Sequence, residues 1–594
     1  MPSFRFLALA ALLVVACCTG YALLVLSPAD PAAIAQLDRI TQHLDWHIRP
    51  VSTAQLQVVR GLLWAGLGLA ATAFGLLSRT TSGQWELQQW RQELAASSQG
   101  LRASWQQLPR YQRVAATMAL VFLLALRVYF SLTRPPHAEE VASYEFFVRQ
   151  GLLAVSAYYP IPNNHILSNT LSWVFYQVVP SFWWTMRLPV LLVSTAGTVL
   201  WFTGLLRTTN FRVALLTMAL FSCLQLALYH ASAGRGYWLL ITLAGTVFFA
   251  TLRLSHPTGP KRLASLPFLL AGVLGMYTVP SFAYVLASAG AWLGFQYLHR
   301  GAGIEMIRLG VLSTAVVLGA TALYAPLLLV SGIGVLVGNG FVAPRPAAEF
   351  WAGLPAYLWF NEGSLVGQRS IGAGLWLLVV IAAAVLIARR LLQEKLRPLA
   401  ELALWWVLLP NALLVLQRVF PPERVLLYKA LPFFLLVALL ADYGLRWAKT
   451  HGRTAAAQTF LASTCLVFIG YQIYTTDKLS HGARPQVAAY QAAFSWLSQQ
   501  PSAPILAPEP LHNLYFRFFA HTQTGLPPAS SFLVPDAAAR PGVRYRYVVA
   551  FPEHHGFFQP EFNFKPAYRS DQVEIHVLPD SSTWTAPIAV RQKP

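Results

Sequence analysis

The chain has 594 residues, of which 56% are hydrophobic and only 11% are charged. Soluble domains carry about 25% charged residues, so this composition excludes both a soluble globular protein and a disordered one. The formal net charge is +20, but excess Lys and Arg in a membrane protein mostly encode the orientation of its loops. No basic stripe with interleaved aromatic residues points to nucleic acid, so we expect no nucleic-acid partner.

The first apolar run covers residues 6–26 and follows Arg5. A cleaved secretory signal has an apolar core of about 7–15 residues, so this longer run predicts an uncleaved membrane anchor. Residues 14–17 also resemble a lipoprotein cleavage box, a pattern that short apolar runs produce by chance. All four cysteines lie inside apolar runs, which predicts neither a disulfide framework nor a zinc site.

Apolar runs close to the length of a spanning helix recur along most of the chain. We predict about 13 spans, at residues 6–26, 61–78, 114–133, 189–206, 213–230, 237–252, 264–279, 281–298, 309–331, 370–388, 401–416, 425–443 and 454–474. A cytoplasmic N-terminus then puts about 20 basic residues in short inner loops and about 12 in the longer outer loops, as the positive-inside rule requires. We therefore expect a multi-pass protein of a bacterial cytoplasmic (inner) membrane, with its N-terminus inside.

Residues 166–180 are apolar too, but counting them as a span would reverse every later loop and put the richest basic clusters outside. At about 15 residues the segment is also short for a bilayer crossing. We predict that it is a helix on the outer membrane surface, within one large external loop at 134–188.

The tail after the last predicted span, residues 475–594, lies outside in this scheme. Helical periodicity at 485–499 and alternation at 544–551 and 572–579 predict a small mixed α/β domain. Its histidines lack the spacing of a metal site; they are His512, His521, His554 and His555. The predicted fold is thus an all-α polytopic bundle with external surface helices and this external domain. The predicted divisions are an N-terminal two-helix addition with a cytoplasmic segment (1–113), the transmembrane domain (114–474) and the C-terminal domain (475–594).

Costly polar residues mark the external loop. It opens with Arg134-Pro135-Pro136-His137, followed by Glu139 and Glu140 directly after a span. Ionisable groups at the membrane face are expensive and indicate function, although acids in a first helical turn also complement the helix dipole. The segment 158–165 then combines tyrosines, prolines, asparagines and a histidine. Carbohydrate recognition needs such amides, imidazole and aromatic faces, but the same residues are common in turns and caps.

Basic residues in the outer loops are exceptions to the orientation rule. They are Arg187, Arg235, Arg345, Arg418, Arg424 and Lys429. Arginine binds phosphate through a rigid bidentate fork, so a lipid phosphate at the outer interface would be a natural ligand. The alternative role for any one of them is to anchor the protein to lipid headgroups.

Together these motifs resemble those of the C-type (GT-C) superfamily of membrane glycosyltransferases, in particular the protein O-mannosyltransferase and aminoarabinose transferase relatives. The family has an acidic pair, usually Asp-Glu, in its first large external loop, then surface helices and an Arg-Leu-Pro before the next span. Here these stand as Glu139-Glu140, residues 166–180 and Arg187-Leu188-Pro189. The turn at 234–237 resembles the family's Ser-Arg-x-Tyr-like turn, and residues 421–428 resemble its late Pro-x-x-Arg-Tyr-like motif.

The resemblance covers residues 114–445 and departs from the family in having Glu-Glu as the acidic pair. It implies a glycosyltransferase that moves a sugar from a polyprenyl-phosphate donor to an acceptor hydroxyl at the external (periplasmic) face, with inversion. A carboxylate would draw off the acceptor proton and cations would stabilise the departing phosphate. The implied base is Glu140 or Glu139. The implied phosphate ligands are Arg424, Arg235, Lys429 and Arg187, and the implied sugar or acceptor ligands are Asn164, His165, Asn163, Tyr159, His137 and Tyr237.

The implied partners are the polyprenyl-phosphate-linked sugar, membrane lipids and an acceptor of unidentified class (glycan, lipid or protein). The sequence shows no dedicated metal cage, although a carboxylate pair could hold Mg²⁺ through water. Three alternatives stay open. A transporter or flippase of lipid-linked sugars would need paired broken helices and midplane ions, of which Arg127 is the clear example. A polysaccharide polymerase or ligase would concentrate Arg and His in a late external loop, and a non-catalytic scaffold would use the tail.

Overall fold

The structure is a computed structural model that describes residues 2–41, 48–257, 261–338, 343–507, 509–523, 533–534, 545–552 and 565–578. His554 and His555, two of the tail histidines that lack the spacing of a metal site, lie outside these residues. In the first part of the chain the helices are α1 (Pro2–Leu26), α2 (Pro31–Leu37), η1 (Asp38–Thr41), α3 (Thr53–Arg79), α4 (Thr81–Gln106), α5 (Arg110–Thr133), α6 (Ala138–Ser143), η2 (Tyr144–Val148), α7 (Leu152–Ala157), α8 (Ile166–Val178), η3 (Trp183–Arg187), α9 (Leu188–Thr208), α10 (Phe211–Cys223), α11 (Gln225–Ala231) and α12 (Tyr237–Ser255).

The second part continues as a helical bundle and ends in a small sheet. Its helices are α13 (Lys261–Thr278), η4 (Pro280–Phe282), α14 (Ala283–His299), α15 (Gly303–Val330), α16 (Gly334–Val337), α17 (Ala347–Val366), α18 (Gly372–Ala388), η5 (Glu394–Leu396), α19 (Arg397–Gln417), η6 (Glu423–Lys429), α20 (Ala430–Thr450), α21 (Thr454–Gly482), α22 (Arg484–Ser498) and α23 (Pro510–Thr522). Its strands are β1 (Ile505–Leu506), β2 (Leu533–Val534), β3 (Tyr547–Ala550), β4 (Tyr568–Arg569) and β5 (Glu574–Val577).

Every predicted span is helical, although the span at 213–230 is divided between α10 and α11. The apolar helices confirm a multi-pass membrane protein. Within the residues that the structure describes, nine helical segments are long and apolar enough to cross a membrane. A tenth is the bent pair α10 and α11, whose axes differ by 73°. The number of about 13 that we derived from run lengths near the bilayer thickness stays a prediction. The helix α17, 20 residues long, was not among the predicted elements.

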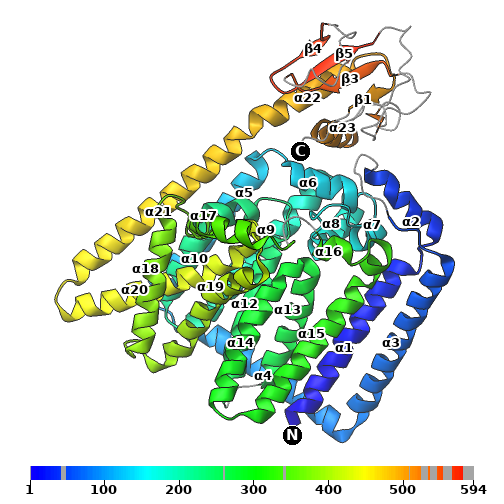
Figure 1. Cartoon of the computed structure of the whole chain (residues 1–594). Helices are drawn as coiled ribbons and strands as arrows, with labels where there is room; N and C mark the ends of the chain where they lie inside the picture. Colours follow the sequence, from blue (N-terminus) through cyan, green and yellow to red (C-terminus); the bar gives the residue numbers. More distant parts are fainter. Residues whose placement is uncertain are drawn as a thin grey trace.

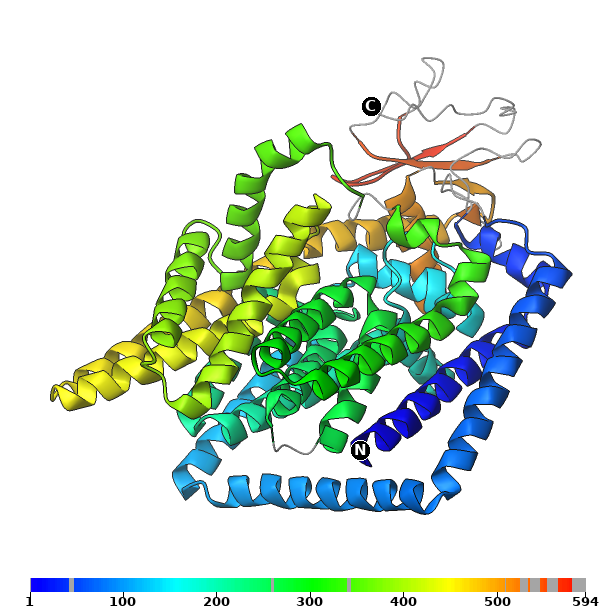
Figure 2. The same ribbon diagram turned by 60° about the horizontal axis from the view of Figure 1, so that its bottom comes forward.

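The cytoplasmic segment of the prediction is one long helix, α4, which lies across one end of the bundle between α3 and α5 (Figure 2). The side chain of Thr80 caps its N-terminus by accepting from the Gly83 N–H. Arg262, at the start of α13, pairs with Glu93 of α4 at 2.9 Å and also with Glu86. Glu86 is only 1% exposed, so separating it from Arg262 would leave a buried charge without a partner. These ion pairs therefore fix α4 against the bundle.

The predicted mixed α/β domain is confirmed at the C-terminus. Within the residues that the structure describes, its five strands have the order β2-β1-β3-β5-β4. The strand β1 is parallel to β2 and β3, whereas β3 and β4 are antiparallel to β5. The predicted helix and two strands correspond to α22, β3 and β5. The helix α23 lies between this sheet and α6 (Figure 1).

The two ends of the bundle carry different elements. The N-terminus lies at one end, and the short helices α6, α7 and α8 lie at the other, near the C-terminal sheet (Figure 1). The segment that we assigned to the membrane surface forms α8, which has 13 residues and is therefore short for a span. The loop at 134–188 and the C-terminal domain thus share one side of the molecule, opposite the N-terminus.

Candidate active site

The acidic pair sits in the first turn of α6, which begins directly after α5. Prolines at 135 and 136 disfavour helix before them, and His137 caps α6: its Nδ1 accepts from the Glu139 N–H, while Glu140 accepts from the His137 N–H. Both acids thus lie in a first helical turn, the arrangement that we weighed as an alternative, and Glu140 also completes a capping box. Neighbouring side chains on a helix point about 100° apart, so the two glutamates face different surroundings.

Glu140 is buried in a clamp that uses both of its carboxylate oxygens. Oε2 accepts from Arg134 Nη2 at 2.8 Å and Arg187 Nη2 at 3.1 Å, and Oε1 accepts from the Gly234 N–H at 2.6 Å. Burial alone would raise the pKa of Glu140, but the two guanidinium groups and the Gly234 N–H outweigh it and hold the pKa at about 2. Glu140 therefore joins the end of α5, the start of α9 and the turn before α12.

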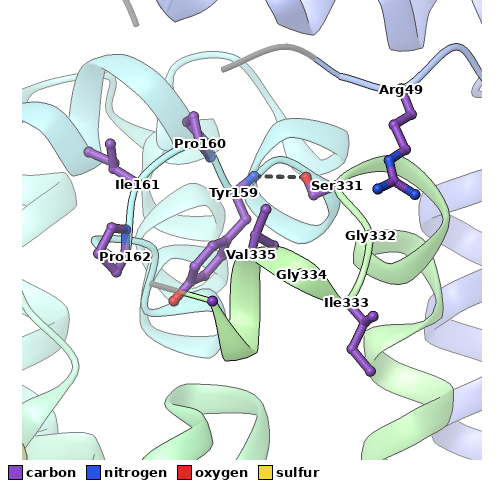
Figure 3. A pocket seen from close by; sticks show the side chains of 11 residues that line it. Arg49, Tyr159, Pro160, Ile161, Pro162, Ser331, Gly332, Ile333, Gly334 and Val335 are labelled. Carbon is purple, nitrogen blue, oxygen red and sulfur yellow. Dashed lines mark hydrogen bonds between the residues drawn. The ribbon is translucent and has the colours of Figure 1, made fainter. Parts of the chain in front are cut away.

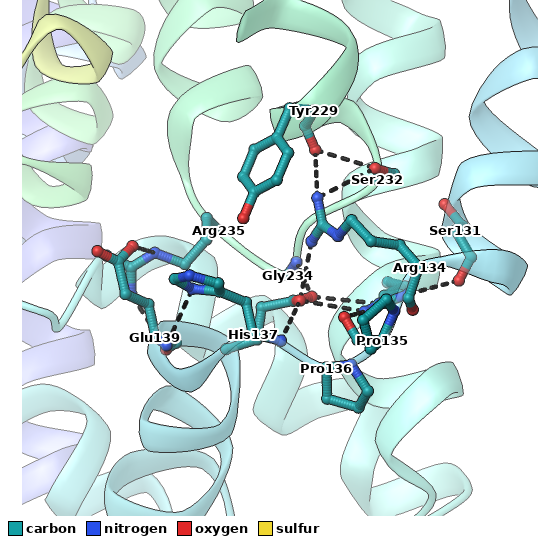
Figure 4. Close-up of polar contacts among 12 residues, drawn as sticks. Ser131, Arg134, Pro135, Pro136, His137, Glu139, Tyr229, Ser232, Gly234 and Arg235 are labelled. Carbon is teal, nitrogen blue, oxygen red and sulfur yellow. Dashed lines mark hydrogen bonds and ion pairs between the residues drawn. The ribbon is translucent and has the colours of Figure 1, made fainter. Parts of the chain in front are cut away.

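The arginines of this clamp also donate to backbone carbonyls and so hold the loop. Arg187 Nη1 donates to the carbonyls of Ser131 at 2.6 Å and Arg134 at 2.9 Å. Arg134 donates to the Tyr229 carbonyl at 2.8 Å and lies over the Tyr229 ring (Figure 4). The structure thus places Arg187 outside the cavity described below. Our sequence analysis named Arg134 at the start of the loop but gave it no role, although a cation just before an acidic pair was a usable signal.

Glu139 has the opposite environment, since its side chain is 30% exposed and faces a cavity. Its Oε1 lies 3.0 Å from Arg424 Nη2, and its Oε2 lies 3.6 Å from Arg235 Nε. Figure 4 shows Glu139 and Arg235 together, on the side of His137 away from Arg134. Burial opposes ionisation, but Arg235 and Arg424 lower the pKa of Glu139 below its ordinary value of 4.5. Glu139 is therefore an ionised carboxylate that a ligand can reach.

One cavity of about 410 Å³ brings seven of the predicted site residues together. They are Glu139, Tyr159, Asn163, His165, Arg235, Tyr237 and Arg424. The remaining wall is largely apolar and comes from distant parts of the chain, including Phe146, Val279, Tyr284, Pro421, Leu511 and Leu514. A charged patch inside an apolar wall suits a ligand that joins a polar headgroup to a hydrocarbon chain.

Arg235 is fixed at the base of this cavity. Its Nη1 donates to the Asn163 carbonyl at 2.9 Å and to Ser143 Oγ at 3.0 Å, and the residue is only 4% exposed. Arg424 is more accessible, with 31% of its side chain exposed, and its Nε donates to the Tyr237 hydroxyl at 3.0 Å. One guanidinium group is therefore held by the protein, and the other is open to a ligand.

His165 is a neutral donor in this arrangement. Its Nδ1 accepts from the Gly236 N–H at 2.9 Å, which leaves the ring proton on Nε2, 3.5 Å from Arg235 Nη2. Burial, together with nearby Arg235, lowers the pKa of His165 well below its ordinary value. Asn163 is also oriented, since its amide donates to the Glu139 carbonyl at 2.9 Å.

Besides Arg187, three predicted ligands lie away from the cavity lining. Asn164 braces the turn, because its amide donates to the carbonyls of Val155 at 2.8 Å and Tyr158 at 3.0 Å. His137 caps α6, as described above. Lys429 is buried in a separate cluster, 2.5 Å from Glu362 Oε1 and 2.6 Å from Asn411 Oδ1. Each of these side chains already has a structural partner.

A second cavity of about 510 Å³ adjoins the first and shares Tyr159, Ile161 and Pro162 with it (Figure 3). Its other side is formed by the glycine-rich turn after α15 and by Arg49. The Tyr159 N–H donates to Ser331 Oγ at 3.0 Å, which ties the two sides together. Tyr159 therefore stands in the wall between two cavities.

The residues around Glu139 fit a metal ion poorly. Among the described residues, no three His, Cys, Asp or Glu side chains gather as a metal site. Both oxygens of Glu140 are used by the clamp, and Glu139 already faces Arg235 and Arg424. Two guanidinium groups would repel a divalent cation at this point.

Comparison with known proteins gives a fold. No family model matches the sequence, and no curated protein matches it either. The chain is similar to the crystal structure of ArnT from Cupriavidus metallidurans bound to undecaprenyl phosphate, with a TM-score of 0.51 and 14% identity, over 77% of this chain and 97% of that one. The apo state of the same protein gives a TM-score of 0.51 and 15% identity, over 78% and 98% of the two chains. The chain therefore has the fold of the GT-C membrane glycosyltransferases, as its motifs predicted.

Proposed function

We propose that this protein transfers a sugar from a polyprenyl-phosphate donor to an acceptor hydroxyl at the outer face of the cytoplasmic membrane. The observation that carries the proposal is the reachable Glu139 carboxylate between Arg235 and Arg424, in a cavity with an apolar wall. A GT-C fold supports it, as does the fact that a protein of similar fold was solved with undecaprenyl phosphate. In this proposal the external loop, the cavity and the C-terminal domain lie in the periplasm.

Glu139 is the proposed base, and Glu140 holds the loop. The acceptor oxygen attacks the anomeric carbon, its proton passes to Glu139, and the bond from that carbon to the phosphate oxygen breaks. A single displacement of this kind inverts the anomeric configuration. Glu140 cannot take this part without breaking its contacts with Arg134 and Arg187, and its pKa of about 2 makes it a weak base.

The two arginines stabilise the leaving phosphate. In the free protein Arg424 contacts Glu139 at 3.0 Å. A bound phosphate competes for the arginine, which raises the pKa of Glu139 and improves it as a base. As the proton reaches Glu139, its negative charge disappears while charge grows on the phosphate. Arg424 and Arg235 thereby stabilise the carboxylate before the transfer and the departing polyprenyl phosphate after it.

Neutral groups around Glu139 are suited to hold the sugar and the acceptor. His165 offers an Nε2 proton, and Asn163 and Tyr159 line the same cavity. Burial raises the pKa of Tyr159 to about 12, so its hydroxyl stays a donor. The transporter alternative is less favoured, since the described residues contain one bent helix pair, α10 and α11, and that class needs matching breaks in two halves.

Binding of undecaprenyl phosphate to the purified protein tests the proposal by native mass spectrometry. Charge-assisted hydrogen bonds contribute about 1.5–3 kcal/mol, so we expect Arg424→Ala to weaken binding by about ten- to a hundredfold. Arg345→Ala is the matched control, because Arg345 is exposed and pairs with Glu349 outside the cavity lining. Equal affinities for the wild type and Arg424→Ala would remove Arg424 from the site. Failure of the wild type to bind would reject the donor class.

A further inference from the structure

The C-terminal domain contributes directly to the cavity that contains Glu139. Leu511 and Leu514, on α23, both line it. Residues three apart share a face of a helix, so one side of α23 points to the cavity. Leu514 is 6% exposed, whereas Leu511 is 37% exposed. An exposed leucine beside a charged cavity is an apolar surface that a ligand can cover.

α23 is docked on the catalytic loop by specific contacts. The Tyr515 hydroxyl donates to the Pro136 carbonyl at 3.0 Å, next to the start of α6. Phe518 packs edge-on against Phe182, with ring centres 4.9 Å apart. Arg517 donates to the Ile40 carbonyl at 2.9 Å, so the N-terminal region contacts the same helix. Through these contacts α23 packs against the rest of the protein and forms part of the cavity wall.

A buried charged cluster fastens the far end of α23. Glu145 of η2 is fully buried, and its Oε2 lies 3.0 Å from Arg149 Nη1 and 2.9 Å from His521 Nδ1. Arg149 also contacts the His521 ring. Burial opposes the charge of Glu145, but the bond from His521 and the charge of Arg149 lower its pKa. The carboxylate therefore stays ionised and holds the C-terminal domain to the loop.

We propose that α23 is a wall of the donor site, where Leu511 and Leu514 contact the bound lipid-linked sugar. The Glu145–Arg149–His521 cluster positions this wall. The inference rests on the proposed function and adds substrate contacts in a domain that the sequence left without a role. An apolar wall toward the aqueous side keeps out water, which would otherwise compete with the acceptor hydroxyl for the anomeric carbon.

Ligand protection of a cysteine at position 511 tests the wall. A membrane-impermeant maleimide should label Leu511→Cys, and undecaprenyl phosphate should slow that labelling by about tenfold at a concentration ten times its Kd. Gln491→Cys, exposed on α22, should label at the same rate with or without the lipid. The wild type gives the background, since its cysteines lie in apolar helices.

The outcomes separate this proposal from the function on which it rests. Normal lipid binding with no protection of Leu511→Cys overturns the wall alone. Absence of lipid binding by the wild type overturns both. Protection at both positions 491 and 511 indicates non-specific coating by the lipid and also overturns the proposal.

The fastening cluster is tested separately. We expect His521→Ala to loosen α23, which should weaken binding of undecaprenyl phosphate by about tenfold and speed the labelling of Leu511→Cys. His481→Ala is the matched control, because His481 also pairs with a carboxylate, that of Asp477, but on the exposed surface of α21. Unchanged binding and labelling in His521→Ala would show that the cluster does not position the wall.

Discussion

At the scale of single residues, two adjacent glutamates have been given separate environments by the helix on which they lie. Glu140 points into a clamp of Arg134, Arg187 and the Gly234 N–H, with 1% exposure. Glu139 points into a cavity and is partly exposed. A carboxylate whose acceptor positions are all filled stabilises a loop, while one with an open side can accept a proton. This division of roles makes the two residues separable by experiment.

Glu139→Gln should lower sugar transfer by about 10²–10⁴-fold, the contribution of a positioned general base, with little change in the unfolding temperature. The assay uses polyprenyl-phosphate sugars extracted from host membranes and reconstituted with the protein in liposomes. Glu140→Gln should instead lower the unfolding temperature, because it leaves Arg134 and Arg187 buried without their carboxylate. Wild-type transfer by Glu139→Gln would reject the base.

The pH dependence of stability gives a second test of Glu140. Its pKa falls from 4.5 to about 2 on folding, so its ionised form stabilises the protein above pH 4.5, and this contribution is lost as pH falls toward 2. The difference in unfolding temperature between the wild type and Glu140→Gln should therefore be full at pH 7 and shrink below pH 4.5. A difference that stays constant down to pH 3 would contradict the clamp.

The pH dependence of transfer reports Glu139 in the free protein. Its pKa lies below 4.5, and that of His165 lies well below 6.5. The acid limb of kcat/KM should accordingly lie below pH 4.5, with no inflection near pH 6.5. An inflection at pH 6.5 that disappears in His165→Gln would show instead that the histidine carries the titrating proton.

At the scale of elements, short helices carry the residues of the candidate site, and the long helices hold the short ones in place. α6 is anchored through Glu140 to the ends of α5 and α9, and α23 covers it from the C-terminal domain. At the opposite end α4 is fastened to α13 by Arg262. The two ends of the bundle therefore carry separate polar fastenings, which can be disturbed independently.

Arg262→Ala should release α4 without altering the cavity. Its loss leaves Glu86 buried with no cation, so the helix should exchange amide protons faster and be cut more readily by trypsin. Binding of undecaprenyl phosphate should stay at the wild-type level, because no part of α4 lines the cavity. Weaker lipid binding in this variant would mean that the two ends are coupled.

At the scale of the whole molecule, the orientation of the chain in the membrane sets the side on which the proposed reaction takes place. The N-terminus and α4 lie at one end, and the external loop, the cavity and the C-terminal sheet lie at the other (Figures 1 and 2). The excess of basic residues in short loops favours a cytoplasmic N-terminus. With that orientation, which stays a prediction, the proposed site faces the outer leaflet.

Labelling of intact spheroplasts with an impermeant maleimide checks this orientation. Gln491→Cys, on exposed α22, should react in intact cells, whereas Gln99→Cys, exposed on α4, should react only after the membrane is permeabilised. The reverse pattern would place Glu139 in the cytoplasm and reject a periplasmic reaction.

The class of the molecule follows from the sequence alone, as does the neighbourhood of the candidate site. Apolar runs must become helices in lipid, because unpaired backbone groups are too costly there. We could recognise the acidic pair, the turn at 158–165 and Arg424 as motifs, because polar groups cost free energy at the membrane face. The tertiary structure was needed to show which glutamate is reachable, that Lys429 pairs with Glu362, and that Leu511 of the tail lines the same cavity as Glu139. Such contacts join residues far apart in the chain. A local sequence pattern does not identify the partner that a residue meets in the folded protein.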